Sequence, residues 1–210
     1  MTFFRPIAFG TLLLLSAVCS AADKPNVILI LADDQGWNGL SCQMDPNVPE
    51  SKSDYYQTPN IDRLANGGMR FSRGYAPAPV CSPTRHSIQF GISPAKTRVT
   101  YNSYGTKQHC NPELAMANLI KKADPSYATA HFGKWHLGHL PQYLPTSHGF
   151  DTYFGIPYSN DMSQIHRPKR DTYQYLLPFF QGNEVVEWEP NQAQFTQRFT
   201  DETVRFIEEH

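Results

Sequence analysis

A cysteine, a proline and an arginine follow one another closely in the segment CSPTR at positions 81–85. Ser82 and Pro83 have the preferences of a helix N-cap and a first helical residue, so Cys81 is expected beside a helix N-terminus. The positive end of the helix dipole favours a nucleophile or a bound anion there, and Arg85 follows one turn later on the same face. The segment therefore suggests a nucleophile or anion site, with a buried structural cysteine as the alternative.

A lysine and a histidine, Lys134 and His136, lie two residues apart in the segment GKWHLG, directly after a predicted strand. In extended backbone, residues two apart point to the same side. An ammonium group and an imidazole aimed together at the end of a strand suit anion binding and proton transfer. His131 and His139 lie nearby, but the spacing of these histidines matches no standard zinc ligand set.

Two adjacent carboxylates, Asp33 and Asp34, follow an uninterrupted apolar run at 27–32. Such a run is typical of a strand buried on both faces of a parallel sheet, and ligands bind beyond the carboxyl ends of such strands. Adjacent carboxylates repel each other unless a cation lies between them, so ligation of Ca²⁺ or Mg²⁺ is a natural use for them. The spacing alone favours the other interpretation, a solvated acidic turn after a strand.

The elements that must position these clusters predict an α/β fold. Strands are expected at 27–32, 69–75 and 127–132, and helices where a capping residue precedes proline, at Thr58, Ser82 and Asn111. This order favours a largely parallel central sheet flanked by helices. The segment 143–188 is rich in Pro, Tyr and Gly and is expected to form long loops before a last helix at 194–209. Because a parallel sheet returns from such a helix into another strand, the fold looks C-terminally incomplete.

The composition is that of a globular protein. The chain has 210 residues, 40% hydrophobic and 18% charged, which excludes a disordered tail and a coiled coil. Its formal net charge of −1 offers no basic excess, so binding to nucleic acid or to an anionic membrane through bulk charge is excluded. A local anion site remains compatible with this balance.

The first 22 residues have the layout of a secretory signal peptide. A positive charge precedes an apolar run at 7–18, and small residues at 20–22 fit a cleavage site. The run is short for a membrane span, which makes an uncleaved anchor the weaker alternative. A lipoprotein anchor through Cys19 is not expected, because a bulky residue precedes it. We therefore expect residues 23–210 to be exported to a periplasm or secreted, with no membrane-spanning segment after cleavage.

Taken together, the segments resemble the N-terminal part of the formylglycine-dependent sulfatases, which are arylsulfatase-like enzymes of the alkaline-phosphatase-like superfamily. The matching segments, in the family's order from Lys24 to about Asp161, are KPNVILILADDQGW, TPNIDRLANGGMRFSRGYA, CSPTRHSIQFG, HFGKWHLG and HGFDTYFGIPYSND. The resemblance implies that 23–210 is the N-terminal part of a sulfatase catalytic domain with an alkaline-phosphatase-like layered fold.

The resemblance also implies the nucleophile and the metal. Cys81 would be oxidised to formylglycine by a separate formylglycine-generating enzyme, and the hydrated aldehyde would attack the sulfur of a sulfate ester. Asp33 and Asp34 would help to hold a Ca²⁺ ion that also contacts residue 81, where the metal polarises the nucleophile and neutralises sulfate charge. With Cys81 modified, Cys42 and Cys110 remain and could pair.

Four further residues take roles by the same resemblance. Arg85 would stabilise the hydrated aldehyde, and Lys134 would contact sulfate oxygens. His136 would take a proton from the remaining hydroxyl and so expel sulfate. Ser159 matches a position near the sulfate. The substrate would be a sulfate ester, such as a sulfated glycan or an aryl sulfate.

Residues that the family places later in its sequence, including a further metal-binding pair and the acid for the leaving alcohol, would fall beyond His210. We therefore expect these 210 residues alone to be inactive or nearly so. Two other functions fit the same residues. One is a phosphonate or phosphate ester hydrolase of the same superfamily, and the other is a non-catalytic exported module that binds sulfated glycans.

Overall fold

The computed structural model describes residues 24–99, 111–165 and 176–210, and the chain divides into two units, Met1–Gln35 and Gly36–His210. The helices of the described residues are α1 (Pro59–Gly67), α2 (Cys81–Phe90), α3 (Pro94–Thr97), α4 (Met116–Ala123) and α5 (Phe195–Glu209). The strands are β1 (Ala130–Lys134), β2 (Thr152–Ile156), β3 (Pro178–Gln181) and β4 (Glu184–Trp188). Short 3₁₀ turns connect several of these elements. None of the helices in the described ranges has the length and apolarity needed to cross a bilayer.

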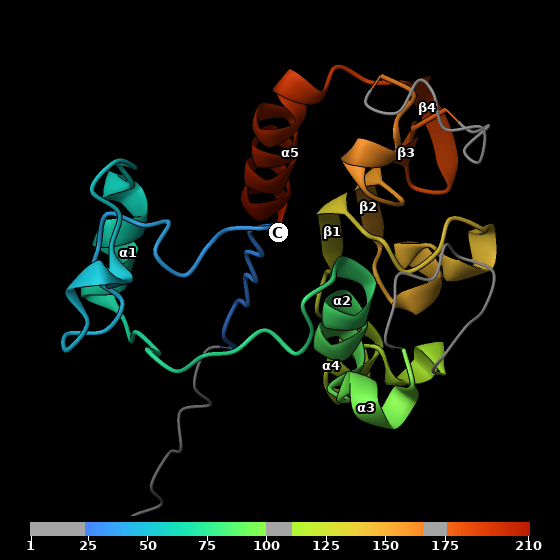
Figure 1. Cartoon of the computed structure of the whole chain (residues 1–210). Coiled ribbons are helices and arrows are strands. Elements are labelled where there is room, and N and C mark those ends of the chain that lie inside the picture. The colour runs from blue at the N-terminus through green and yellow to red at the C-terminus, as the bar shows by residue number, and fades with distance from the viewer. Residues whose placement is uncertain (1–23, 100–110, 166–175) are drawn as a thin grey trace, which may run out of the picture. The chain divides into compact units, whose positions relative to one another are not determined.

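The four strands form one sheet in the order β1-β2-β3-β4 (Figure 1). Strands β1 and β2 run parallel, in a register that pairs Ala130 with Thr152 and Lys134 with Ile156. The other two pairings, β2 with β3 and β3 with β4, are antiparallel. The predicted α/β class is thus confirmed, whereas the described part of the sheet is mixed rather than largely parallel. The tight β3–β4 connection explains one of the two antiparallel pairings, because a turn of two residues can join only antiparallel strands.

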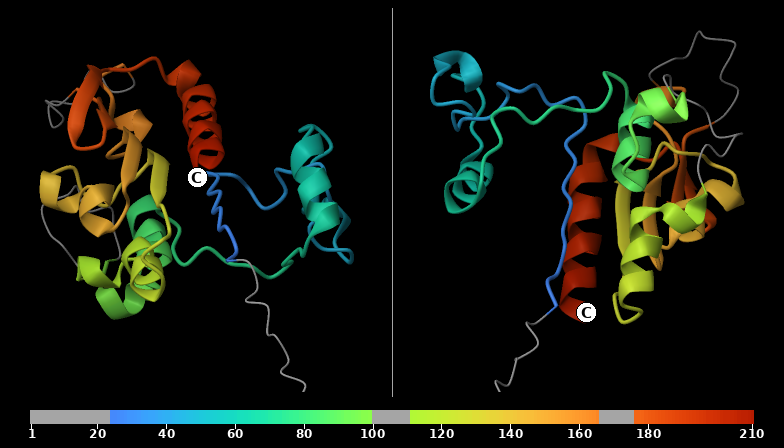
Figure 2. Two further views of the ribbon diagram at one scale, coloured as in Figure 1. Left: turned by 180° about the vertical axis from the view of Figure 1, so that it is seen from behind. Right: turned by 90° about the horizontal axis from the view of Figure 1, so that it is seen from below.

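Two apolar clusters lie on opposite faces of this sheet. Side chains alternate along a strand, so the neighbours Tyr153 and Phe154 of β2 belong to different clusters. The first cluster, to which α4 contributes, consists of Ala117, Trp135, Leu144, Phe150, Tyr153 and Phe180. The second consists of Ile156, Leu177 and Phe179, with Phe154, Tyr158, Phe195 and Phe199 packed against it. Helix α5 supplies the last two and runs beside the strands (Figure 2).

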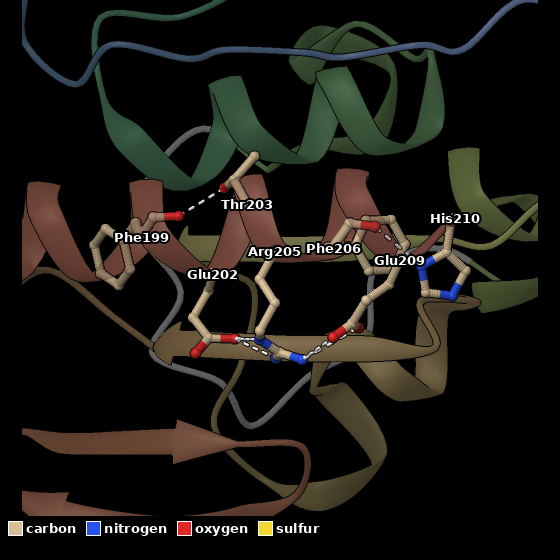
Figure 3. Close-up of polar contacts among 7 residues, drawn as sticks. All are labelled: Phe199, Glu202, Thr203, Arg205, Phe206, Glu209 and His210. Carbon is tan, nitrogen blue, oxygen red and sulfur yellow. Dashed lines mark hydrogen bonds and ion pairs between the residues drawn. The ribbon is translucent and has the colours of Figure 1, made fainter.

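Helix α5 is the predicted last helix and begins one residue later than expected. Its inner face packs Phe206 against Phe132 of β1 at a ring-centroid distance of 5.9 Å. On the exposed face, Arg205 lies between Glu202 and Glu209 and forms an ion pair with each (Figure 3). Such exposed pairs stabilise a helix only slightly, so the apolar face is what holds α5 to the sheet.

A pair of glycines allows β1 and β2 to approach closely. Gly133 and Gly155 are direct partners in the parallel register, and Gly133 has a φ of +104°. A Cβ atom on Gly155 would lie 2.0 Å from the carbonyl oxygen of Gly133. Only glycine fits at position 155. Its partner Gly133 directly precedes Lys134 in the sequence.

Three predicted elements differ in the structure. The run at 27–32 and the segment 69–75 are extended or turned without being strands, and Val27 to Leu31 are between 42% and 82% exposed. A strand exists only where another backbone pairs with it, and neither segment has a ladder partner among the described residues of its own unit. The predicted loop at 143–188 instead contains β2, β3 and β4. Its aromatic residues belong to strands, which is where aromatic side chains are favoured.

The helix starts follow the predicted signals with small shifts. Helix α1 begins at Pro59 after Thr58 and is followed by Gly68, as expected. At Asn111 the side chain caps a short 3₁₀ turn, and α4 begins only at Met116. Helix α2 begins at Cys81 itself, with Val80 in the N-cap position, so Ser82 is not the N-cap.

Cys42 is a buried thiol rather than half of a disulfide in the described part of the chain. Its removal from water and the neighbouring Asp62 carboxylate raise the pKa of this thiol above its usual range. Cys110 lies outside the described residues, so the pairing of the two cysteines stays a prediction.

Candidate active site

The first residue of α2 brings Cys81 to the predicted helix N-terminus. Val80 precedes it in extended conformation and makes no side-chain cap, so the first backbone N–H groups of the helix are left to other acceptors. The Sγ atom of half-buried Cys81 lies 3.1 Å from the Nζ atom of Lys134, which donates to it. Fifty-three positions separate these two residues in the sequence.

The parallel pairing of β1 and β2 brings Lys134 and Ser159 together. Lys134 is the last residue of β1, and Ser159 follows the end of β2, so both lie at the same edge of the sheet. The Nζ atom of Lys134 lies 3.3 Å from the Oγ atom of Ser159. One ammonium group thus touches both the thiol at the start of α2 and a hydroxyl beyond β2.

Arg85 reaches the same strand end from one turn further along α2. Its guanidinium donates a hydrogen bond to the backbone carbonyl of Lys134. The Nε2 atom of His131 lies 3.3 Å from that carbonyl, which suits an Nε2–H tautomer. The backbone of Lys134 is therefore held by two side chains, while its own side chain extends to Cys81 and Ser159.

His136 is buried and has a left-handed backbone conformation. Its φ is +59°, and its side chain is 2% exposed. The predicted extended backbone from Lys134 to His136 is therefore wrong, because the chain leaves the strand at Lys134 and turns. The N–H of His136 donates to the carbonyl of Pro157 at 3.0 Å, and its own carbonyl accepts from the Oγ of Ser82 at 2.8 Å.

An aromatic cluster surrounds His131. Its ring contacts those of Trp135, Phe150 and Tyr153 at centroid distances of 5.1, 5.5 and 5.9 Å. Removal from water and the positive charge of Arg85 lower the pKa of His131 to about 4. His131 is thus neutral at physiological pH and acts as a packing and hydrogen-bonding group.

The depressed pKa of His131 predicts a pH dependence of stability. An unfolded histidine binds a proton near pH 6.5, whereas folded His131 does so only near pH 4, so protons favour the unfolded chain between these values. Its contribution is complete above pH 6.5 and is lost as the pH falls towards 4. We expect His131→Gln to remove about 2–3 kcal/mol of the stability difference between pH 7 and pH 4.5, as measured by urea unfolding.

The control for that measurement is His210→Gln, which changes an exposed histidine at the end of α5. This variant should keep the pH dependence of the unaltered chain. A His131→Gln variant with an unchanged difference between the two pH values would contradict the assignment of the acid sensitivity to His131.

The carboxylates Asp33 and Asp34 belong to the first unit and are exposed. Asp34 has a φ of +56°, a conformation that aspartate tolerates better than most residues. Their oxygens suit Ca²⁺ or Mg²⁺, but Ca²⁺ takes six to eight oxygen ligands. Within the described ranges, no three His, Cys, Asp or Glu side chains gather into a metal site. These two residues therefore fit part of a calcium site and not the whole of one.

The second unit thus brings together four of the predicted residues: Cys81, Arg85, Lys134 and Ser159 meet where α2 contacts the carboxyl edge of β1 and β2. His136 joins them through its backbone contact with Ser82. An ammonium group, a guanidinium group and a helix N-terminus together favour a bound anion beside residue 81. This combination suits transfer chemistry on an anionic group at residue 81.

Two contacts of this arrangement were not predicted from the sequence. One joins Ser82 to His136, and the other joins His131 to Lys134. Ser82 has the preferences of an N-cap and was interpreted as one, whereas its hydroxyl bonds a carbonyl 54 positions away. No local pattern signals such a bond, because it depends on how α2 packs against the end of β1.

Comparison with known proteins gives the family. A sequence model described as Sulfatase matches residues 25–210. Arylsulfatase G of Rattus norvegicus is 36% identical over 211 residues, which cover 90% of this chain and 38% of that protein. N-acetylgalactosamine-6-sulfatase of Mus musculus is 32% identical over 215 residues, which cover 94% of this chain and 39% of that protein. The chain therefore spans less than half the length of these relatives.

A solved structure agrees with this. The crystal structure of Ps i-CgsB in complex with k-i-k-neocarrahexaose has a TM-score of 0.69 and 28% sequence identity, and the match covers 89% of this chain and 42% of that one. The α/β arrangement and the match over residues 25–210 therefore lead to one conclusion: the chain belongs to the sulfatase family, of whose fold it contains a part.

Proposed function

We propose that this chain carries the nucleophile and the anion-binding groups of an enzyme that hydrolyses sulfate esters. The observation that carries the proposal is the contact between Cys81 and Lys134, in which a thiol at a helix N-terminus lies 3.1 Å from an ammonium group. The family supports the same reaction class. A fixed positive charge beside the nucleophile offsets the electrostatic repulsion between the nucleophile and an anionic substrate, so attack on the substrate is favoured.

Residue 81 is proposed to act as formylglycine, made from Cys81 by a maturation enzyme. As its hydrate, this group supplies a hydroxyl nucleophile for the sulfur of the ester. Cys81 lies at the first helical position with its side chain half-buried, so it shares the first turn of α2 with the N–H groups of the helix start. These N–H groups favour negative charge at residue 81 and around it.

Lys134 and Arg85 are the residues of this chain that supply positive charge to the proposed anion site. The Lys134 ammonium, between Cys81 and Ser159, is placed to bind sulfate oxygens. Arg85 fixes the end of β1 through the Lys134 carbonyl and adds a guanidinium charge close to residue 81. Ser159 offers a hydroxyl that orients the Lys134 ammonium and donates to a sulfate oxygen in turn.

His136 is proposed to move the proton in the second half of the reaction. An imidazole is suited to this, because its usual pKa lies near neutral pH. Its backbone is held by Pro157 on one side and by Ser82 of α2 on the other. A positioned acid–base group of this kind contributes about 10²–10⁴-fold to a rate.

Asp33 and Asp34 are proposed to hold Ca²⁺, with Mg²⁺ as the less favoured ion. Bound there, the ion would supply Lewis-acid stabilisation of negative charge. Two carboxylates are fewer than the six to eight ligands of Ca²⁺, so further oxygen ligands are required. We therefore infer that these 210 residues alone hydrolyse sulfate esters slowly or not at all.

Sulfated glycans are the proposed substrate class, with aryl sulfates as the second choice. The names of the relatives support this, since one is an N-acetylgalactosamine-6-sulfatase and one solved structure contains k-i-k-neocarrahexaose. Export to a periplasm or the extracellular space is proposed on the sequence of residues 1–22, which lie outside the described residues. Sulfated glycans of cell surfaces and matrices would be met there.

The test is a peptide mass map of the protein from its native host, read at residue 81, together with an ester assay. We expect the aldehyde at residue 81 and turnover of a sulfated sugar that exceeds turnover of the matching phosphate ester. Cys81→Ala should abolish that turnover while the thermal unfolding midpoint stays close to that of the unaltered protein. An unmodified cysteine at 81 in active protein would overturn the proposed mechanism.

A further inference from the structure

We propose that Ser82 is a positioning residue that fixes the backbone, and hence the imidazole, of His136 beside residue 81. The inference deepens the proposed function, because it assigns a task to a side chain that touches no substrate. Ser82 follows Cys81 directly in the first turn of α2, so one helical turn carries both the nucleophile and the group that holds His136.

The bond from Ser82 to His136 is buried and close. Ser82 is 0% exposed, and its Oγ lies 2.8 Å from the His136 carbonyl oxygen, to which it donates. A buried carbonyl that water does not reach needs a hydrogen-bond donor from the protein. Breaking such a buried bond costs free energy, because the carbonyl is left without a partner. The bond therefore fixes the distance between the start of α2 and the backbone at position 136.

His136 needs such a restraint because its backbone is strained. A φ of +59° is uncommon for a residue with a Cβ atom, and surrounding contacts must hold the chain in it. The N–H of His136 donates to the carbonyl of Pro157, and its C=O accepts from Ser82, so the residue after β2 and the first turn of α2 both hold His136. Without the bond from Ser82, the carbonyl of His136 can move, and φ of His136 can relax towards the negative values that residues with a Cβ atom prefer.

The contact is part of a two-point attachment of α2 to the end of β1. Arg85 donates to the carbonyl of Lys134, and Ser82, three residues earlier in the helix, donates to the carbonyl of His136. Both attachments use backbone carbonyls and not the side chains of Lys134 and His136. Ser82 is thus the link through which the position of His136 is set relative to residue 81.

Thr84 provides a matched control on the same helix. Its Oγ1 donates to the carbonyl of Ala78 at 2.8 Å, which is the same kind of bond as that of Ser82 but does not involve His136. Thr84 also lies within the CSPTR segment that a maturation enzyme would meet. A comparison of Ser82→Ala with Thr84→Ala therefore separates the hold on His136 from general effects on α2 and on modification of residue 81.

The experiment has one readout on the 210-residue chain and one on the enzyme from its native host. In the chain, nuclear magnetic resonance of ¹⁵N,¹³C-labelled histidine reports the backbone and ring environment of His136. In the enzyme, kcat and KM are measured on a sulfated sugar after the aldehyde content at residue 81 is determined by mass spectrometry. We expect Ser82→Ala to shift the His136 resonances and to lower kcat about 10- to 100-fold at equal aldehyde content, with little change in KM.

Thr84→Ala should leave the His136 resonances and kcat near those of the unaltered protein. If Ser82→Ala does not fold, Ser82→Cys places a weaker donor at the same site and should give a smaller shift in the same direction. Unchanged His136 resonances in a folded Ser82 variant overturn the inference. Absence of turnover and of the aldehyde in the unaltered protein overturns the proposed function instead, and the resonances still decide the role of Ser82.

Discussion

Replacement of Lys134 by alanine is expected to lower turnover of a sulfate ester by about 10²–10³-fold, the range for loss of one preorganised donor to developing negative charge. The ammonium group of Lys134 lies 3.1 Å from the Sγ of Cys81 and 3.3 Å from the Oγ of Ser159. It is therefore the group that links the nucleophile position to the far side of the anion site. Its removal takes a positive charge from the place where the sulfate is proposed to bind.

The structure makes this variant informative, because the contacts that hold the strand end use the backbone of Lys134 and not its side chain. Arg85 and His131 both reach its carbonyl oxygen, which alanine retains. The variant should thus keep the fold while it loses the ammonium. Steady-state kinetics at measured aldehyde content at residue 81, together with a thermal unfolding midpoint, separate these two effects.

Lys121→Ala is the matched control, because it also removes an ammonium group. Lys121 lies in the last turn of α4, is partly exposed and pairs with Asp151. Its turnover should equal that of the unaltered enzyme. Lys134→Arg keeps the charge but changes the geometry from a point charge to a planar fork, so partial activity is expected. Full activity of Lys134→Ala would remove Lys134 from the proposed site.

Local signals identified the helices and the site residues that depend on them. Pro59 after Thr58 marks the start of α1, and Gly91, in left-handed conformation after α2, marks its end. The position of Cys81 near a helix terminus depends on such neighbouring residues, although α2 begins at Cys81, two residues before Pro83, which was the expected first helical residue. Lys134 at a strand end was likewise predicted from the apolar segment before it, although β1 extends two residues further than expected.

The parts of the site that depend on distant contacts could not be predicted in this way. Ser159 meets Lys134 only because β2 pairs in parallel with β1, and β2 lies in a segment that was interpreted as loop. Proline, glycine and tyrosine in that segment indicated turns, whereas pairing with β1 decided the structure. The left-handed turn at His136 also depends on its partners Pro157 and Ser82, because this conformation is uncommon for any residue other than glycine.

Gly155→Ala is expected to prevent folding, or to lower the free energy of unfolding by more than about 4 kcal/mol, which is the range of exceptional substitutions. The added Cβ would lie 2.0 Å from the oxygen, 2.7 Å from the carbon and 2.9 Å from the nitrogen of Gly133. All three are backbone atoms of the neighbouring strand, so no side chain can turn aside. Strands β1 and β2 would have to separate, although five residue pairs hold them in register.

Gly67→Ala is the control, because nothing lies within 4 Å of the added Cβ at the end of α1 and alanine favours a helix. Thermal unfolding and the yield of soluble chain give the comparison. A Gly155→Ala midpoint close to that of Gly67→Ala would show that β1 and β2 are not in contact as described. The consequence reaches the site, since Lys134 follows Gly133 directly and Ser159 follows β2. The same glycine pair that lets the strands meet also places the ammonium and hydroxyl groups 3.3 Å apart, so separation of the strands would dismantle the anion site.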